Sequence, residues 1–307
     1  MNTLEQLAQY TTIVADTGDL SAIKRLKPID ATTNPSLITA AFASGEHDEL
    51  IKSVKGLDTD TAIDTLTVAL GKEILTHITG RVSTEVDARL SFDTDATVKK
   101  ALEFIEMYDK LGVPSKRILI KIASTWQGIK AAEILEKQGI HCNLTLLFTD
   151  TQARSCADAG VTLISPFVGR ITDWQKAHEQ KPAIAISDDM GVNSVKAIYD
   201  FYKAHGYRTE VMGASFRSSD QILALAGCDL LTISPALLDE LAGMDTEVSR
   251  ALNPVQDISA KPVALSLDDF NATQDSHPLN ALLLKGIDGF VQARDTLAQQ
   301  LAQQLAN

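Results

Sequence analysis

Arg117-Ile-Leu-Ile-Lys-Ile-Ala123 is an apolar run in which one lysine stands between two isoleucines. A short run of β-branched and other apolar residues is typical of a strand that is buried on both faces. Burying the ammonium group of Lys121 there costs free energy, unless the group is paired or loses its proton. The segment therefore predicts a buried strand that contains a chemically unusual lysine.

Two interpretations of this lysine follow. A free lysine has a pKa near 10.4, so about one side chain in a few thousand is neutral at pH 7. Desolvation that lowers the pKa to about 7–8 raises the nucleophilic fraction by roughly two to three orders of magnitude, which is how enzymes prepare Schiff-base lysines. The alternative is a lysine on an edge strand whose amine reaches water. The rest of the chain favours the nucleophile.

Short β-type runs alternate with helical patterns along the whole chain. The expected strands are Thr11–Asp16, Ile29–Asn34, Arg81–Asp87, Arg117–Ile122, His141–Leu146, Val161–Ser165, Glu210–Ser215 and Leu230–Ser234. The expected helices are Ser21–Leu26, Ala62–His77, Thr94–Leu111, Gln127–Gln138, Thr151–Ala159, Ser194–His205, Ser219–Ala226 and Pro235–Ala242. This alternation predicts an α/β fold, a (β/α)8 TIM barrel that forms a single domain over residues 1–307. A doubly wound open sheet is the competing fold, although it would normally divide so long a chain.

Two stretches are longer than the repeating unit. Phe167–Val192 contains Gly169, Pro182 and the turn Asp188-Asp-Met-Gly191, so we expect a functional connection or a local subdomain there. Pro278–Leu305 has apolar residues at near-helical spacing. It predicts an additional C-terminal helix that packs on the barrel or, alternatively, forms a subunit contact.

Side chains of barrel strands alternate between the interior and the surrounding helices. Ile118, Ile120 and Ile122 share one parity and suit the helix-facing side, so Lys121 is expected to point into the barrel. The further sets that share a face are Asn143 with Thr145; Ser83, Glu85 and Asp87; Val161, Leu163 and Ser165; and Val211, Gly213 and Ser215.

Polar residues stand at or near the carboxyl ends of the expected strands, where barrel enzymes have their active sites. Asp16, Asn34, Glu85 and Thr145 would thus meet Lys121 at one mouth. Each has an ordinary alternative: Asp16 as a turn residue, Asn34 as a helix cap, and Thr145 as a plain strand residue. A structural ion pair is the alternative for the acids, joining Glu85 or Asp87 to Arg81 or Arg89. Their convergence on one mouth favours a functional site.

Two loops at the same end are suited to anions. Ser215-Phe-Arg217 follows the seventh strand, where barrels of this kind often bind phosphate. Pro166-Phe-Val-Gly-Arg170 follows the sixth strand, and Gly169 permits close approach of a backbone. Arginine forms bidentate contacts with phosphate, so Arg170 and Arg217 are candidates for a sugar-phosphate site. The alternative for each is a surface ion pair with a loop acid.

The bulk composition argues against several classes of protein. The net charge of −12 argues against nucleic acid or an anionic membrane as partner, and no apolar stretch approaches the length of a membrane span. The amino terminus has neither the basic region nor the apolar core of a signal peptide. Cys142, Cys156 and Cys228 are expected to be reduced core thiols, and the six histidines lack metal-ligand spacing. We therefore expect a cytoplasmic protein without a dedicated metal site.

Taken together, these segments resemble class I transaldolase, of the type common in bacteria, along essentially the full length. The matching segments are Val14–Asp19, Asp30–Ser36, Val82–Arg89, Ile118–Gly128, Cys142–Phe148, Ile164–Arg170, Val211–Arg217 and Leu231–Ala236. The resemblance implies a (β/α)8 barrel, a lysine Schiff base, no metal or organic cofactor, and a homodimer. It also implies a transferase of carbohydrate metabolism, in the non-oxidative pentose phosphate pathway. The enzyme would move a dihydroxyacetone unit from sedoheptulose 7-phosphate to glyceraldehyde 3-phosphate, giving erythrose 4-phosphate and fructose 6-phosphate.

The resemblance also implies a role for each candidate residue. Lys121 would form the imine, Glu85 would move protons through a water held with Thr145, and Asp16 would be the base for carbon–carbon cleavage. The residues expected to bind substrate are Asn34, Asn143 and Ser165 at the three-carbon fragment, Phe167 beside it, and Arg170, Ser215 and Arg217 at the phosphate.

Three loops depart from the family pattern: Thr149-Asp-Thr151, the turn at 188–191, and Ser218-Ser219. We expect them to affect acceptor preference or subunit contacts rather than the chemistry. The alternative enzyme is a fructose 6-phosphate aldolase that releases free dihydroxyacetone; chain length, Glu85 and Phe167 favour transfer. A non-catalytic barrel that binds sugar phosphate is the alternative outside enzymes.

Overall fold

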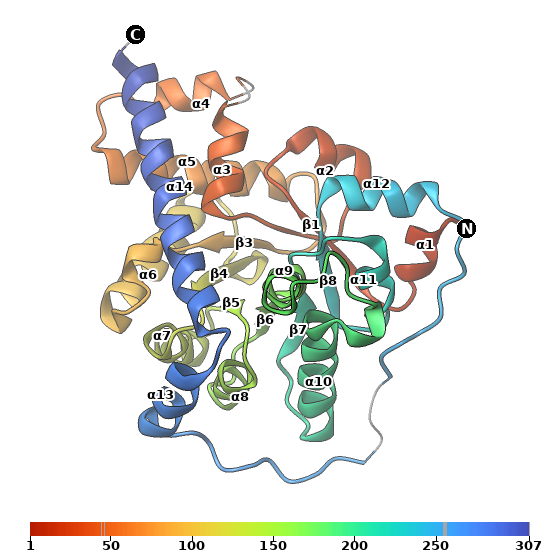
Figure 1. Ribbon diagram of the computed structural model, residues 1–307. Coiled ribbons are helices and arrows are strands. Elements are labelled where there is room, and N and C mark those ends of the chain that lie inside the picture. Colours follow the sequence, from red (N-terminus) through yellow and green to blue (C-terminus); the bar gives the residue numbers. More distant parts are fainter. Residues whose placement is uncertain (44, 46, 254–256, 307) are drawn as a thin grey trace.

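Eight parallel strands close into a barrel, as predicted (Figure 1). The computed structural model describes residues 1–43, 45, 47–253 and 257–306. Each strand pairs with the next in the chain, and β8 pairs with β1 to close the ring. The strands are β1 (Thr12–Asp16), β2 (Asp30–Thr32), β3 (Val82–Glu85), β4 (Ile118–Ala123), β5 (Cys142–Leu147), β6 (Leu163–Pro166), β7 (Glu210–Gly213) and β8 (Leu230–Ile233).

Helices connect the strands and surround the barrel. Those between strands are α2 (Leu20–Leu26), α3 (Pro35–Ala43), α4 (Asp48–Ser53), α5 (Thr59–Leu75), η1 (Ala88–Leu90), α6 (Thr94–Lys110), η2 (Ser115–Arg117), α7 (Trp126–Lys137), α8 (Asp150–Asp158), α9 (Val168–Glu179), η3 (Ile186–Asp188), α10 (Met190–Ala204) and α11 (Ser219–Leu223). Those outside the strand repeat are α1 (Thr3–Leu7), α12 (Pro235–Gly243), α13 (Leu267–Ser276) and α14 (Asn280–Ala306). The predicted additional C-terminal helix is α14.

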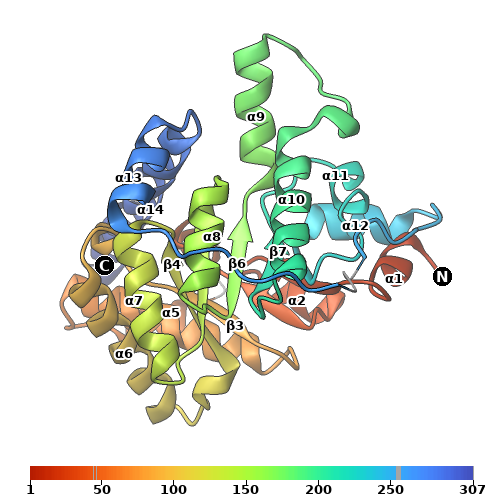
Figure 2. The same cartoon turned by 90° about the horizontal axis from the view of Figure 1, so that it is seen from below.

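The sequence predicts a long connection over residues 167–192, and the structure has helices there. This stretch contains the helix α9, which projects beyond the other helices in Figure 2, and the short helix η3. Phe167 stands at the N-cap of α9 without a side-chain cap bond, so the usual start signal of a helix is missing. The helices α3 and α4 are likewise elements that the sequence patterns do not predict.

Strand parity places one set of side chains inside the barrel. Val14, Leu119, Leu163, Met212 and Leu230 form an apolar layer that draws on five strands. Lys121 follows Leu119 on the same face of β4, and the isoleucines of β4 pack outward against the helices. The apolar layer is therefore the floor of the barrel mouth.

The parity prediction for the seventh strand is wrong. Met212 belongs to the interior layer, whereas Val211 packs in the outer core. Ser215 still reaches the mouth, because its φ of 63° turns the chain after Ala214 into the left-handed region. The backbone conformation after β7, rather than regular alternation along the strand, therefore places Ser215 at the mouth.

The structure settles the ion-pair alternatives for Glu85 and Asp87. Arg81 lies at the amino end of the barrel, where it pairs with Asp30 at 3.0 Å and Glu210 at 2.8 Å. Asp87 pairs with Arg89. Glu85 pairs with neither arginine, and its carboxylate lies beside Lys121 instead.

The loops that depart from the family pattern begin helices. Thr149 and Gln152 form a capping box at the start of α8. The Asp189 side chain accepts hydrogen bonds from the backbone of Gly191 and Val192 at the start of α10, and Ser218 caps α11. Thr149, Asp189 and Ser218 thus have a structural role as helix caps. A side-chain oxygen at the N-cap accepts hydrogen bonds from backbone N–H groups that have no partner within the helix.

The long helix α14 attaches the C-terminal region to the barrel. It packs against α3, α5 and η1, and runs along one side of the molecule in Figure 1. Arg294 of α14 is 8% exposed and lies 3.0 Å from Asp60, 3.1 Å from Asp64 and 3.1 Å from Asp87. This cluster, in which Arg294, Asp64 and Asp87 are buried and Asp60 is exposed, joins α14 to α5 and to the loop that follows β3.

The segment between α12 and α13 is extended. In its described part it contains no helix or strand, and it passes the end of α10, where the Ser259 amide donates to the Ala204 carbonyl at 2.7 Å (Figure 2). Cys142, Cys156 and Cys228 are free and buried, in line with the expected core thiols. Among the helices of the described residues, none is both long and apolar enough to span a membrane.

The substitution Arg294→Gln is expected to lower the free energy of unfolding by about 2–3 kcal/mol, because it removes the buried guanidinium between Asp64 and Asp87, which then keep only Lys100 and Arg89 as cationic partners among the described residues. Equilibrium urea unfolding followed by tryptophan fluorescence measures the change. Arg25→Gln is the matched control, since Arg25 forms an ion pair with Asp239 in which its side chain is 55% exposed. We expect a loss of less than about 1 kcal/mol there. Equal losses in the two variants would contradict the proposed anchoring of α14.

Candidate active site

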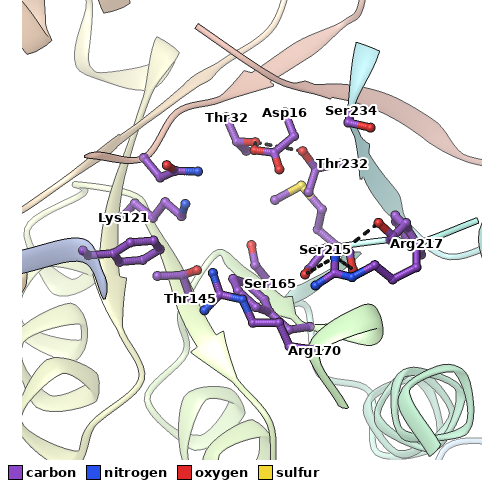
Figure 3. A pocket seen from close by; sticks show the side chains of 16 residues that line it. Asp16, Thr32, Lys121, Thr145, Ser165, Arg170, Ser215, Arg217, Thr232 and Ser234 are labelled. Atoms are coloured by element: carbon purple, nitrogen blue, oxygen red, sulfur yellow. Dashed lines mark hydrogen bonds between the residues drawn. The ribbon is translucent and has the colours of Figure 1, made fainter. Parts of the chain in front are cut away.

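A cavity of about 200 Å³ opens at the carboxyl ends of the strands. Figure 3 shows Asp16, Lys121, Thr145, Ser165 and Arg170 pointing from different strands and loops toward the same space. Its complete lining is Asp16, Thr32, Asn34, Lys121, Thr145, Ser165, Phe167, Arg170, Met212, Ala214, Ser215, Phe216, Arg217, Thr232, Ser234 and Phe290.

Lys121 lies at the inner end of this cavity. The residue is 5% exposed, and its Nζ lies 3.1 Å from Glu85 Oε2. Nζ also donates a hydrogen bond to the carbonyl oxygen of Thr33 at 3.1 Å. The ring centre of Phe290 lies 5.8 Å from Nζ. The amine is therefore held by Thr33, which directly follows β2, and by Glu85 of β3, and Phe290 of α14 lies near it.

Burial raises the pKa of the Glu85 carboxyl above its usual range, although Lys121 and Arg170 act in the opposite direction. A carboxyl with a raised pKa retains a proton more readily. Glu85 is placed to exchange a proton with Lys121.

Two buried oxygens near the amine have no hydrogen-bond partner among the described residues. One is Glu85 Oε2, which is close to Lys121 Nζ but not aligned for a hydrogen bond. The other is Thr145 Oγ1, on β5 beside β4. Buried polar atoms are nearly always satisfied by protein or by ordered water. The arrangement fits the expectation that these two side chains share a water.

Asp16 is the last residue of β1 and lines the cavity. Its carboxylate accepts a hydrogen bond from Thr32 Oγ1 at 3.0 Å. Thr32 Oγ1 in turn lies 2.8 Å from Thr232 Oγ1. Since the Thr32 proton is directed at Asp16, Thr232 serves as donor to Thr32. This chain of hydroxyls fixes the carboxylate while leaving it at the cavity wall.

Asn34 caps a helix and also lines the cavity. Its side-chain oxygen accepts the backbone N–H of Leu37 in the first turn of α3, as a helix cap does. The side chain also lines the cavity. Because the oxygen is used by the helix, the amide nitrogen is the group that remains for a ligand.

Asn143 is fully buried and is absent from the cavity lining. It donates to Ser83 Oγ at 3.0 Å and accepts from Ser165 Oγ at 2.6 Å. Ser165 lines the cavity, so in this structure Asn143 orients Ser165 and joins β3, β5 and β6. Direct contact of Asn143 with substrate stays a prediction.

Arg170 and Arg217 flank the outer part of the cavity together with Ser215 (Figure 3). Arg217 donates to Asp173 at 2.9 Å and to the Ser215 carbonyl at 3.1 Å, so for Arg217 the ion-pair alternative also holds. Arg170 has no ion pair within the described part of the chain. Burial, and then Arg217, lower the pKa of Arg170. An unpaired, half-buried guanidinium is suited to an incoming anion.

Gly169 lets the two anion loops touch. Its N–H donates to the Ser215 carbonyl at 2.9 Å, and a Cβ at this position would collide with that oxygen and lie 2.7 Å from Arg217 Cγ. The expected close backbone approach is therefore present. Glycine brings Arg170 next to Arg217 and Ser215.

Phe167 both packs and lines the cavity. It is 7% exposed, its ring lies 4.8 Å from the Arg170 guanidinium, and it contacts Phe148 edge-on at 5.5 Å. It thus presents an apolar wall beside polar groups.

Several lining residues are missed by sequence reasoning. Thr32, Thr232 and Ser234 share the inward parity of their strands, so the same alternation could have identified them. Phe290 comes from α14, more than 150 positions from Lys121 along the chain, and no local pattern connects the two.

The family is shown by comparison with known proteins. The sequence model described as Transaldolase/Fructose-6-phosphate aldolase matches residues 13–301. The chain belongs to this family. A protein named transaldolase in Thermosynechococcus vestitus is 52% identical over 322 residues, which cover 100% of this chain and 82% of that protein. A transaldolase of Nostoc sp. PCC 7120 is 51% identical, covering 99% and 97%. A transaldolase B of Pasteurella multocida is 49% identical, covering 99% and 100%.

Replacing Gly169 by alanine is expected to weaken the binding of inorganic phosphate by roughly tenfold or more, since it forces the two arginine-bearing loops apart and charge-assisted contacts are lost. Calorimetric titration with phosphate measures the dissociation constant. Gly243→Ala is the control, because an added Cβ there meets no heavy atom within 4 Å. Unchanged affinity in Gly169→Ala would mean that the loops do not form the anion site.

Proposed function

We propose that this chain is a transaldolase. It would move a dihydroxyacetone unit from sedoheptulose 7-phosphate to glyceraldehyde 3-phosphate, giving erythrose 4-phosphate and fructose 6-phosphate. The observation that carries the proposal is Lys121 Nζ, buried 3.1 Å from Glu85 in a cavity that also contains Asp16 and two arginines. Relatives that bear the name transaldolase at about 50% identity over nearly the full chain support the same reaction.

The first stage is imine formation at Lys121. The neutral amine adds to the ketose carbonyl, and the resulting carbinolamine loses water as the carbon–nitrogen double bond forms. Through the water that it shares with Thr145, Glu85 carries a proton from the added amine to the carbonyl oxygen and then gives its own acid proton to the departing hydroxyl, so that the imine is left protonated. The raised pKa of Glu85 suits this exchange. A group that both takes and gives protons works best when its pKa is close to the pH of the reaction, and the usual pKa of a carboxyl lies well below neutral.

Carbon–carbon cleavage follows. Asp16 takes the proton of the C4 hydroxyl, the C3–C4 bond breaks, and the aldose leaves as an aldehyde. The bonding electrons move into the protonated imine, which becomes an enamine of the three-carbon fragment. Thr32 holds the Asp16 carboxylate in place during this step. Attack of the enamine on the acceptor aldehyde reverses the sequence.

The enamine must be kept from protons until the acceptor binds. The Asn34 amide and the Ser165 hydroxyl, the latter set by Asn143, would hold the hydroxyls of the fragment. Phe167 and Phe290 cover the fragment with apolar surface and offer no acidic proton. Retention of the fragment is what separates a transferase from an aldolase.

Arg170, Arg217 and Ser215 would bind the phosphate of the donor and then of the acceptor. The proposed route uses the imine as electron sink and needs no metal ion or organic cofactor. The proposal also includes the cytoplasm as location, a homodimer as the working form, and residues 1–307 as one domain, in keeping with the family resemblance.

The reaction is tested by incubation with fructose 6-phosphate and erythrose 4-phosphate, followed by detection of sedoheptulose 7-phosphate. The alternative, a fructose 6-phosphate aldolase, would release dihydroxyacetone without an erythrose 4-phosphate acceptor. A barrel that only binds sugar phosphates would show no turnover in either assay.

Lys121→Ala is expected to abolish covalent trapping by borohydride in the presence of fructose 6-phosphate, and to lower turnover by roughly three orders of magnitude or more. Mass spectrometry of the trapped protein locates the adduct. Lys137→Ala serves as control, because that lysine is 70% exposed on α7. An adduct that persists on another lysine in the Lys121 variant would refute the proposed nucleophile.

Asp16→Asn should still form the imine yet cleave the ketose about 10²–10⁴ times more slowly, because the amide cannot accept the C4 hydroxyl proton. Borohydride trapping reports the imine, and aldose release reports the cleavage. Cleavage at the wild-type rate would show that another group is the base.

A further inference from the structure

A second cavity, of about 420 Å³, lies outside the barrel between α8, α9, α10 and the start of the C-terminal helices. It shares no lining residue with the candidate active site. Its lining is Phe148, Thr149, Asp150, Ala153, Arg154, Ile171, Met190, Ser194, Ala197, Ile198, Phe201, His277 and Leu279. This volume falls in the range of small-molecule sites, roughly 300–1,000 Å³.

Arg154 is the unusual member of this lining. Within the described part of the chain it forms no ion pair, and its Nε is buried without a hydrogen-bond partner. Its guanidinium lies 5.9 Å from the ring centre of Phe201. Asp158, one turn further along α8, accepts the Tyr207 hydroxyl at 2.7 Å instead. A partly buried cation with no anionic partner and one unsatisfied buried donor is costly, so this site favours an anionic group from outside.

The walls around Arg154 are apolar and partly aromatic. Phe148 is 1% exposed and Ile171 is 1% exposed, whereas Met190 is 38% exposed at the rim. The polar exceptions are few. Asp150 stands exposed in the first turn of α8, and His277 Nδ1 accepts the N–H of Leu279 at 3.2 Å, which leaves Nε2 as the donor of the neutral ring. The chemistry fits a flat apolar body with one anionic group.

We propose that this cavity binds a small aromatic anion, such as an aromatic carboxylate or sulfonate, with its charge at Arg154 and its rings against Phe148 and Phe201. The bound molecule acts on the active site, because the two cavities share a wall. Phe148 meets Phe167 edge-on at 5.5 Å, and Phe167 lines the active site. On α9, Arg170 faces one cavity and its neighbour Ile171 faces the other.

The probe for this site is 8-anilino-1-naphthalenesulfonate, followed by its fluorescence. Its uncharged counterpart is N-phenyl-1-naphthylamine. Arg154→Gln is expected to weaken binding of the sulfonate by roughly tenfold or more and to leave binding of the amine nearly unchanged, because a charge-assisted contact is lost while the apolar walls remain. Arg208→Gln, at an exposed position outside the cavity, is the matched control and should bind both as the wild type does.

A second variant keeps the charge and fills the space. Ala197 is exposed on α10 and lines the cavity, so Ala197→Trp should fold normally and exclude both probes. Sulfonate binding that is equal in wild type, Arg154→Gln and Ala197→Trp would overturn the proposed site. So would loss of binding in Arg170→Gln alone, which would place the probe in the active site.

The effect on catalysis rests on the proposed transaldolase activity, whereas the binding test does not. Saturating sulfonate should change the KM for fructose 6-phosphate at least twofold in the wild-type enzyme and leave it unchanged in Arg154→Gln. Binding at Arg154 without any change in KM or kcat would overturn the coupling. An enzyme without transaldolase turnover that still bound the sulfonate through Arg154 would refute the proposed function alone.

Discussion

The buried contact between Lys121 and Glu85 is the constraint on which the candidate site depends. An amine and a carboxyl that are 5% and 7% exposed are costly to bury apart from each other. They are register partners on β4 and β3, so the backbone ladder of the barrel, rather than a loop, sets their separation. The other groups are arranged around this contact: Thr33 holds the amine, Thr145 faces the same space, and Phe290 closes it.

Positive charge is concentrated locally at the mouth of the barrel. The chain carries a net charge of −12, yet the outer part of the cavity holds Arg170 and Arg217. Arg217 already pairs with Asp173, so part of its charge is neutralised, and the ion pair fixes the position of its guanidinium. Within the described residues Arg170 has no ion pair, and its guanidinium lies 4.8 Å from the ring centre of Phe167, a cation–π distance. A phosphate would thus meet the Arg217 guanidinium, which Asp173 holds in place, and the Arg170 guanidinium, whose charge is not already paired.

The sequence predicts the barrel and most of the mouth because both follow from local rules. Alternation of strands with helices gives the fold, and parity with strand ends places Lys121, Glu85, Asp16 and Thr145 together. These rules fail where the backbone leaves the regular pattern, as at Ser215, or where a side chain serves a neighbour, as Asn143 serves Ser165. They also cannot reach Phe290, since its place depends on how α14 docks across the barrel, a matter of tertiary packing.

Of the five buried side-chain polar atoms without a hydrogen-bond partner in the described chain, three lie beside the two cavities. Glu85 Oε2 and Thr145 Oγ1 lie near the Lys121 amine, and Arg154 Nε belongs to the second cavity. Leaving such an atom unsatisfied costs roughly 1–3 kcal/mol, which ordinary packing avoids. At a cavity wall the cost is removed when a water or a ligand group binds. The same physical criterion points to a place for a water beside Lys121 and supports the proposed anion position at Arg154. The contact of Phe148 with Phe167 joins one wall residue of each cavity within one apolar cluster.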